Sequence, residues 1–430
     1  MTSFTTPFLR RIAVLACLLL SATVAWSGTT KAYTFQAKSY PGSRERQYKV
    51  YVPDGLSGAA PLVMALHGCQ QTHDDVLRDW GLVQAADRHG FILVTPFITS
   101  YDGFRNTNCW GFWFDQHRHQ GGGEPEDLVR IAKEVETRFG VDPRRRYITG
   151  LSSGGAMTVV AAVAHNEYWA AAATTAGLPY GEDAASVSFS CPGSASFHTV
   201  AKVAADMKAE LNDAYPIPLL VAQNERDCTV VAQAGRNIRD AWLKAFGDAA
   251  HDTATEARAT ERACVPFFGE DYGCRQVIYT SDAQTASRSV VETVFFRGPL
   301  DTPDTSDTDH GHYWVGGEQG RDGRWAVRRG PSYPDIVWDF FSRHPRTGPA
   351  GGDPGQPTPQ PEPACTMVEA SAGSHLAAAR AVPGGFWGMR ALSSGDRRDI
   401  GFAWDFFFAV TLYQGAGGLW FSQPPAGCTP

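Results

Sequence analysis

Short apolar segments alternate with helical patterns between residues 47 and 343, and this order restricts the possible architectures. Strands are expected at 47–52, 61–66, 91–96, 146–149, 217–222 and 290–296. Helices are expected between them at 75–89, 125–139, 156–165 and 236–245, with a last helix at 334–343. Several of these strands are apolar at every position, which is typical of a sheet buried on both faces. The alternation predicts an α/β fold with a mainly parallel sheet covered by helices.

A Pro- and Gly-rich segment at 347–364 divides the chain into two parts. Its composition, TGPAGGDPGQPTPQPEP from residue 347, is typical of an extended linker. We expect a catalytic-sized body at 33–346 and a small β-rich module at 365–430. Because so small a module builds only a limited core, a disulfide between Cys365 and Cys428 is expected to close it.

The small module is rich in aromatic side chains, which either form its own core or face outward and hold the chain near an insoluble polymer. They are Phe386, Trp387, Phe402, Trp404, Phe406, Phe407, Phe408, Tyr413, Trp420 and Phe421.

Residues 1–32 are expected to be a secretory signal peptide. Arg10 and Arg11 precede an apolar stretch at 12–25, and small residues follow it. Cleavage is expected after Ala25 or after Ala32; the alternative is an uncleaved anchor. The chain has no second long apolar run, which excludes a multi-span membrane protein. The prediction is a secreted, extracellular protein without stable membrane association after cleavage.

The charge and the cysteine content restrict the possible partners and the cellular location of the chain. The chain has 38 basic and 45 acidic residues, a formal net charge of −7, which argues against a nucleic-acid partner. Eight cysteines remain besides Cys17, and an even number in an exported chain favours disulfides. Neighbourhood in the sequence suggests four pairs: Cys69–Cys109, Cys191–Cys228, Cys264–Cys274 and Cys365–Cys428.

Metal binding is not expected. The cysteines form no C-x-x-C pair, so a zinc site is disfavoured. The acidic cluster of Asp301, Asp304, Asp307 and Asp309 lacks the glycine and glutamate placement of a known calcium loop and is interpreted as a solvated loop. His117 and His119 are interpreted as surface residues. We therefore expect no metal and no cofactor.

A G-x-S-x-G pattern, Gly150-Leu151-Ser152-Ser153-Gly154, lies between an expected strand and an expected helix. This strand–turn–helix context is what a nucleophile elbow requires, and it places Ser152 at the carboxyl edge of the sheet. The alternative is a Ser- and Gly-rich helix cap. The pattern predicts that Ser152 is a catalytic nucleophile.

A serine nucleophile needs a base and a group that orients the base, in the chain order serine, acid, histidine. Asp227 follows the apolar strand at 217–222, with Glu225 as the nearest rival. His312 lies in HGHYWVGG before the last expected helix, with His310 as its competitor. Asp227 and His312 are the predicted acid and base.

Backbone amides are expected to form an oxyanion hole. The early strand at 61–66 ends in Leu66-His67-Gly68-Cys69, a turn that can present an amide to developing negative charge. The residue after the nucleophile presents a second amide. The predicted donors are the amides of Cys69 and Ser153.

Four phrases together carry a family resemblance: LHGCQQ at 66–71, NCWGFWFDQH at 108–117, GLSSGGAM at 150–157 and HGHYWVGG at 310–317. In this order they resemble the secreted polyhydroxybutyrate depolymerases, whose relatives include feruloyl and acetylxylan esterases. The resemblance implies an α/β-hydrolase fold, with the nucleophile at Ser152, the acid at Asp227 and the base at His312. It also implies that Trp110 and Trp113 lie along the substrate cleft, and the position of Trp314 beside His312 suggests the same. The alternative for all three tryptophans is ordinary packing in the core or at its rim.

The resulting prediction is a monomeric, secreted serine ester hydrolase that depolymerises polyhydroxybutyrate or another polyhydroxyalkanoate. The alternative is a feruloyl or acetylxylan esterase that acts on plant-wall polysaccharide. A third reading is a polymer-binding protein without catalytic activity, against which the serine, histidine and acid motifs argue. The expected partner is thus a polyester or an acylated polysaccharide.

Overall fold

The computed structural model describes residues 28–98, 108–246, 258–280, 288–302, 309–347, 367–384, 389–406, 408–414 and 419–423. The expected signal peptide up to residue 27, nearly all of the linker, and Cys365 and Cys428 lie outside the described residues, as do Asp304 and Asp307. None of the described helices combines the length and apolarity that a membrane crossing requires.

A ten-stranded sheet with the order β1-β2-β4-β3-β5-β6-β7-β11-β10-β8 forms the centre of the body. Its strands are β1 Thr29–Phe35, β2 Arg46–Val52, β3 Ala60–Leu66, β4 Ile92–Pro96, β5 Val141–Leu151, β6 Ala171–Thr175, β7 Leu219–Asn224, β8 Arg258–Ala263, β10 Arg275–Thr280 and β11 Val291–Phe296. The pairs from β4 through β11 are parallel, and the pairs at both ends of the sheet are antiparallel. The central strands β3, β4, β6 and β7 are buried at every position. The apolar segments predicted β3, β4 and β7, whereas β6 was not among the expected strands.

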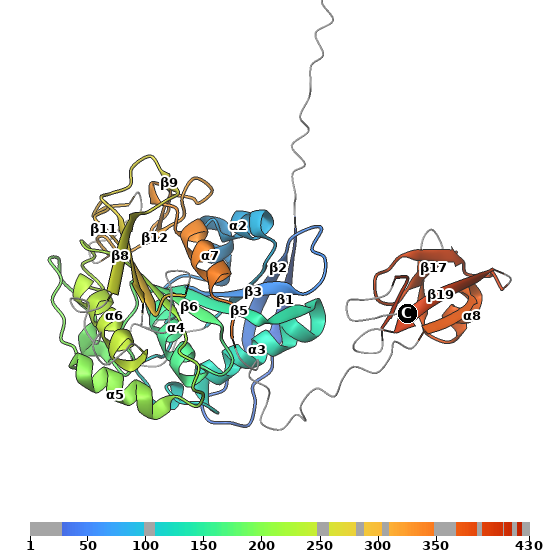
Figure 1. Cartoon of the computed structure of the whole chain (residues 1–430), viewed down its shortest axis with the longest axis horizontal. Helices are drawn as coiled ribbons and strands as arrows, with labels where there is room; N and C mark the ends of the chain where they lie inside the picture. The colour runs from blue at the N-terminus through green and yellow to red at the C-terminus, as the bar shows by residue number, and fades with distance from the viewer. Residues whose placement is uncertain are drawn as a thin grey trace, which may run out of the picture.

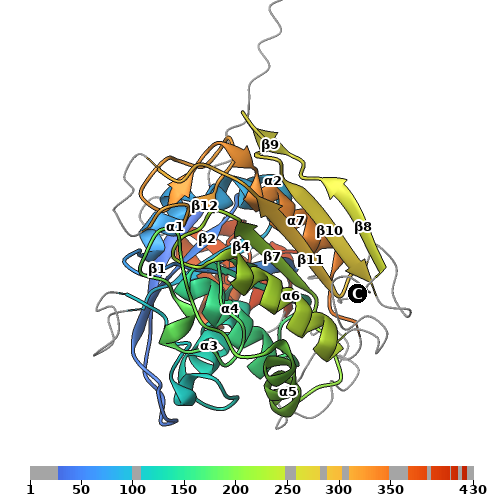
Figure 2. The same cartoon turned by 90° about the vertical axis from the view of Figure 1, so that its left-hand side faces the viewer.

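Helices cover both faces of this sheet (Figure 1). One face carries α3 Gly123–Phe139, α4 Ser153–Ala164, α5 Val200–Glu210 and α6 Ala232–Phe246. The other carries α1 His73–Asp79, α2 Leu82–His89 and α7 Tyr333–Arg343, and α7 lies between α2 and β8 in both views (Figure 2). The predicted α/β architecture with a mainly parallel sheet is confirmed.

The single helix expected at 75–89 is two helices, because Gly81 interrupts it. Gly81 has φ 72°, a left-handed conformation that favours glycine. A Cβ atom there would lie 2.6 Å from the carbonyl oxygen of Gly316. The chain therefore turns between α1 and α2, and the carbonyl of Trp80 accepts a hydrogen bond from Trp314 Nε1 at 3.0 Å.

The described part of the body also contains short strands outside the ten-stranded sheet. They are β9 Phe267–Phe268, β12 Trp314–Val315, β13 Ala326–Val327 and β14 Gly330–Pro331. β12 pairs in parallel with β13, and β9 pairs with β14. The β12–β13 pair fixes the backbone that follows His312.

The described part of the C-terminal module contains two three-stranded sheets and one short helix. The elements are β15 Met367–Ser371, α8 Ala372–Ala377, β16 Ala381–Gly384, β17 Arg390–Ser393, β18 Asp399–Phe402, β19 Ala409–Gln414 and β20 Trp420–Phe421. The buried core here consists of small or medium side chains: Ala372, Ala381, Ala391, Ile400 and Leu412. The expected β-rich character is present, and most described aromatic rings of the module are not part of this core.

Candidate active site

Ser152 occupies a sharp turn between β5, which ends at Leu151, and α4, which begins at Ser153. Its backbone has φ 59° and ψ −122°, a strained conformation for a residue with a side chain. Flanking glycines make the turn possible: a Cβ at Gly150 would lie 2.4 Å from the Gly154 carbonyl oxygen, and one at Gly154 would lie 2.2 Å from that of Leu66. The turn has the geometry of a nucleophile elbow.

His312 and Asp227 form a buried pair. Nδ1 of His312 lies 2.7 Å from Oδ2 of Asp227, and the two residues are only 3% and 5% exposed. The other carboxylate oxygen of Asp227 accepts hydrogen bonds from the amides of Thr229 and Val230, at 2.8 and 2.9 Å. Burial raises the pKa of Asp227 above its ordinary value, and the hydrogen bonds from His312 and the two amides, which favour the charged carboxylate, offset this rise only in part. Asp227 is thus held as an acceptor that fixes the ring of His312.

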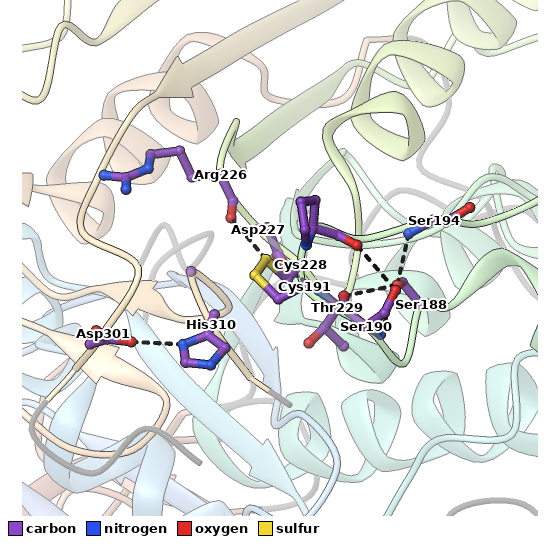
Figure 3. Close-up of a disulfide and its surroundings, with 12 residues drawn as sticks. Ser188, Ser190, Cys191, Ser194, Arg226, Asp227, Cys228, Thr229, Asp301 and His310 are labelled. Atoms are coloured by element: carbon purple, nitrogen blue, oxygen red, sulfur yellow. Dashed lines mark hydrogen bonds and ion pairs between the residues drawn. A yellow bond between two sulfur atoms is a disulfide. The ribbon is translucent and has the colours of Figure 1, made fainter. Parts of the chain in front are cut away.

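The two rival residues are engaged elsewhere. Oε2 of Glu225 lies 3.7 Å from Nη1 of Arg297, and the Glu225 backbone amide donates to the carbonyl oxygen of Phe296. His310 pairs through Nδ1 with Asp301 at 2.7 Å, while its carbonyl oxygen accepts from the Cys228 amide (Figure 3). Neither rival therefore contributes its side chain to the His312–Asp227 pair.

A narrow cleft brings the predicted residues together. Ser152 and His312 both line it. The remaining lining residues come from the turn after β3, the end of β5, the loop after Asp227 and the segments around His312: Gly68, Cys69, Gln70, Gln71, Leu151, Thr229, Asp309 and Trp325. The cleft thus contains a hydroxyl, an imidazole supported by a carboxylate, and the expected oxyanion turn.

The predicted oxyanion donors lie beside Ser152. A Cβ at Gly68 would be 3.2 Å from that of Ser152, so the turn runs directly past the nucleophile. Among the described residues, no acceptor takes a hydrogen bond from the backbone amide of Cys69 or from that of Ser153. Ser153 is also the first residue of α4, and the helix dipole favours negative charge at this end of the helix. Both amides remain available to an anion.

His67 fixes the oxyanion turn from behind. Its Nδ1 donates to the Gly68 carbonyl oxygen at 2.8 Å, and its Nε2 accepts from the Ile98 amide at 3.2 Å. Burial lowers the pKa of His67 to about 4, so the ring is neutral at physiological pH. The Gly68 amide donates to Gln71 Oε1 at 2.9 Å. These bonds keep the turn rigid.

Three of the four predicted disulfides are present: Cys69–Cys109, Cys191–Cys228 and Cys264–Cys274. The first ties the oxyanion turn to the loop that contains Trp110. The second includes Cys228, the residue that directly follows Asp227 (Figure 3). Two disulfides thus flank the residues of the cleft, while the expected Cys365–Cys428 pair lies outside the described residues.

Two of the three tryptophans expected along the cleft belong to the core. Trp110 is 0% exposed and donates from Nε1 to the His67 carbonyl oxygen. Trp314 is equally buried and stacks on Trp80, with ring centroids 4.3 Å apart. Neither ring therefore lines the cleft, contrary to the expectation. Trp113 is partly buried against Phe112 and Phe114 and does not line the cleft.

Trp325 is the tryptophan that does line the cleft, and no feature of the sequence predicted it. It lies 13 positions after His312 in the phrase RDGRW, which has no recognisable spacing signal. Another expectation also fails nearby: His117, expected at the surface, is fully buried and accepts from the Glu124 amide through Nδ1. Of the expected acidic cluster, Asp301 is paired with His310 and Asp309 with Arg324.

Comparison with known proteins supports the resemblance. The family model for esterase PHB depolymerase matches residues 46–264. Feruloyl esterase B of Talaromyces funiculosus is 32% identical over 141 residues, 33% of this chain and 38% of that protein. Poly(3-hydroxyalkanoate) depolymerase C of Paucimonas lemoignei is 35% identical over 130 residues, 30% and 31% respectively. The matches therefore span about a third of the length of each of these relatives.

One solved structure supports the fold over most of the chain. The acetyl xylan esterase from Aspergillus awamori aligns with a TM-score of 0.54 at 18% identity, covering 73% of this chain and all but 1% of that one. At this identity the similarity concerns the fold. Together with the family match, it confirms the α/β-hydrolase architecture.

Proposed function

Because the chain belongs to the esterase PHB depolymerase family, we propose that it hydrolyses carboxylic esters through an acyl-enzyme formed on Ser152. The observation that carries the proposal is the shared cleft: Ser152 in a strained elbow and His312, paired with buried Asp227, line the same narrow space. No simpler structural role accounts for a strained serine, a buried ion pair and two unused amides at one place.

In the proposed first step, Nε2 of His312 takes the proton of Ser152 as Oγ attacks the ester carbonyl. Asp227 holds Nδ1 and stabilises the imidazolium that forms. The proton then passes from His312 to the leaving alkoxide, which departs as an alcohol and leaves Ser152 acylated. Water, deprotonated by His312, attacks the acyl-enzyme, releases the carboxylic acid and restores Ser152.

The amides of Cys69 and Ser153 are proposed to hold the negative oxygen of both tetrahedral intermediates. Loss of one such donor typically costs about 3 kcal/mol of transition-state stabilisation. The His67 bonds and the Cys69–Cys109 disulfide keep the Cys69 amide in place before substrate arrives. This rigidity favours the transition state because no reorganisation is needed at the moment of reaction.

The proposed substrate is a polyhydroxyalkanoate such as polyhydroxybutyrate. The family supports this choice, and so do the exposed aromatic rings of the C-terminal module. Trp404 and Phe408 are 58% and 77% exposed, and Phe402 stacks on Trp404 with ring centroids 5.1 Å apart. Phe406 is exposed as well. Exposed rings gathered on one short segment suit adsorption to an apolar solid.

The alternative is a feruloyl or acetyl ester of a plant-wall polysaccharide. It is favoured by the feruloyl and acetylxylan esterases among the relatives. The proposed triad would serve either substrate. A binding protein without catalytic activity is disfavoured by the intact cleft.

We further propose export and division into parts as the composition indicates: a signal peptide within 1–32, a catalytic body to residue 346, a linker at 347–364 and a substrate-binding module at 365–430. Residues Thr29–Ala32 pair with Lys49–Val52 in the sheet. Cleavage after Ala25 would keep these pairs, and cleavage after Ala32 would remove them. The proposed mature protein is a secreted monomer that needs no cofactor or metal and binds neither nucleic acid nor membrane.

The decisive substrate test compares clearing of a polyhydroxybutyrate suspension with hydrolysis of methyl ferulate and acetylated xylan. Wild-type protein is expected to clear the polyester, and Ser152→Ala to be inactive on all three. Ser342→Ala, an exposed serine on α7, is the matched control and is expected to behave as wild type. Activity on ferulate or acetylxylan without polyester clearing would establish the alternative.

A further inference from the structure

Trp325 reaches the cleft from a segment whose backbone is fixed. Its carbonyl oxygen accepts from the Trp314 amide at 3.0 Å, and the next residue, Ala326, begins β13. The carbonyl oxygen of Arg324 accepts from the hydroxyl of Thr302 at 3.1 Å. The position of the ring relative to His312, two residues before Trp314, is therefore set by the β12–β13 pair.

The Arg324 guanidinium covers Trp325. Its central carbon lies 4.1 Å from the centroid of the ring, a cation–π contact. Nε and Nη2 of Arg324 both donate to Oδ2 of Asp309, at 3.2 and 2.8 Å. The Asp309 side chain is nearly buried, and its carbonyl oxygen accepts from the His312 amide. Arg324 is therefore fixed to the turn that carries His312.

Arg324 also reaches the opposite side of the cleft. Its Nη1 donates to Gln70 Oε1 at 3.2 Å, and Gln70 directly follows the proposed oxyanion donor Cys69. The bridge joins two segments more than 250 residues apart in sequence. It holds Trp325 in a defined place relative to both Cys69 and His312.

We propose that Trp325 forms the apolar wall against which the substrate packs beside the reacting carbonyl, and that Arg324 is a positioning residue for this wall. The inference rests on the proposed ester hydrolysis. Trp325 is the aromatic residue of the cleft lining, and it is half-buried, so part of its surface is available for contact. The wall would select esters with an apolar chain next to the ester group, as in hydroxyalkanoates, over acetyl esters, which present one methyl group.

The test compares kcat/KM for 4-nitrophenyl acetate and 4-nitrophenyl butyrate. Each methylene buried in an apolar site contributes roughly fourfold. Trp325→Ala is expected to lower the butyrate-to-acetate ratio about fivefold to tenfold, mainly through KM on butyrate, because a wall binds ground state and transition state alike. Trp325→Phe keeps a ring and is expected to retain most of the ratio.

Arg324→Lys keeps the charge but loses the planar stack and the fork to Asp309, and it should lower the same ratio about twofold to threefold. If kcat/KM fell equally for both esters, so that the butyrate-to-acetate ratio stayed unchanged, Trp325 and Arg324 would have a structural role only. The proposal of a substrate-binding wall would then be wrong. If neither ester is hydrolysed in a Ser152-dependent way, the proposed function itself is wrong. The two failures are therefore distinguishable.

Discussion

At the scale of single residues, the site depends on side chains and amides that are fixed before substrate binds. Ser152 is held in a backbone conformation that glycine would prefer, and its neighbours Gly150 and Gly154 tolerate no Cβ atom. Asp227 receives two amide hydrogen bonds on one oxygen and His312 on the other. Such preorganisation is how a serine hydroxyl becomes a nucleophile at neutral pH.

Asp227→Asn tests the role of the carboxylate. An amide in this place can donate to Nδ1, which would leave the proton on Nε2 and prevent His312 from acting as a base. We expect kcat for 4-nitrophenyl butyrate to fall by about 10³- to 10⁴-fold with little change in KM. Glu225→Gln is the control and is expected to keep near-normal kcat. If kcat fell by this much in Glu225→Gln while Asp227→Asn stayed active, Glu225 and not Asp227 would be the acid that orients His312.

At the scale of elements, glycine decides where the first helical segment breaks. Gly81 and Gly90 both have left-handed backbones, but only Gly81 has the carbonyl of Gly316 within 2.6 Å of its Cβ position; at Gly90 the nearest atom is 3.5 Å away. Gly90→Ala should cost about 1 kcal/mol of unfolding free energy from backbone strain alone. Gly81→Ala should cost more because the α1–α2 turn must also move.

Denaturant unfolding of both variants by circular dichroism measures this difference. The larger loss in Gly81→Ala is expected to appear as a lower midpoint concentration at the same m-value. Equal midpoints would mean that the contact with Gly316 does not restrain the turn.

The sequence was sufficient for the elements with strong periodicity and for the order of the triad candidates, because strand, elbow and helix leave a local pattern. It was insufficient where local pattern and tertiary contact disagree. β6, Ala171–Thr175, is alanine-rich and has weak strand propensity, so its identity depends on its neighbours β5 and β7. Trp110 was assigned to the cleft because a motif tryptophan in the sequence cannot be distinguished from a core tryptophan. Trp325 belongs to no motif, and its place at the cleft is set by the β12–β13 pair, whose second strand begins at the next residue.

At the scale of the whole molecule, buried neutral histidines make stability depend on pH. Burial lowers the pKa of both His67 and His344 to about 4, from an ordinary value of 6.5. Between these pH values the unfolded chain binds protons that the folded chain does not. The histidine contribution to stability is therefore complete above pH 6.5 and is lost as the pH falls toward 4.

We expect Tm to decrease steadily between pH 6.5 and pH 4.5, with net proton uptake on unfolding. Calorimetry in two buffers of different ionisation enthalpy measures that uptake directly. His344→Gln should reduce it by up to one proton, since the His344 ring accepts from the Ser289 amide and is held neutral. A Tm that is constant over this range would contradict the account.

The module allows a test at the same scale that leaves the cleft intact. Trp404→Ala combined with Phe408→Ala removes two exposed rings and should reduce adsorption to solid polyhydroxybutyrate severalfold. Hydrolysis of soluble 4-nitrophenyl butyrate by the same variant should be unchanged. If adsorption is unaffected, the exposed rings of the module do not bind the polymer.

The measurement that tests the central claim most directly is covalent labelling with a 4-nitrophenyl alkylphosphonate, which transfers its phosphonyl group to an activated serine and releases 4-nitrophenol. Mass spectrometry of the digested protein is expected to find one adduct per chain, on Ser152. The adduct should be absent in Ser152→Ala and form much more slowly in His312→Ala. An adduct on another serine, or equal labelling of the His312→Ala variant, would contradict the assignment of Ser152 and His312 as nucleophile and base.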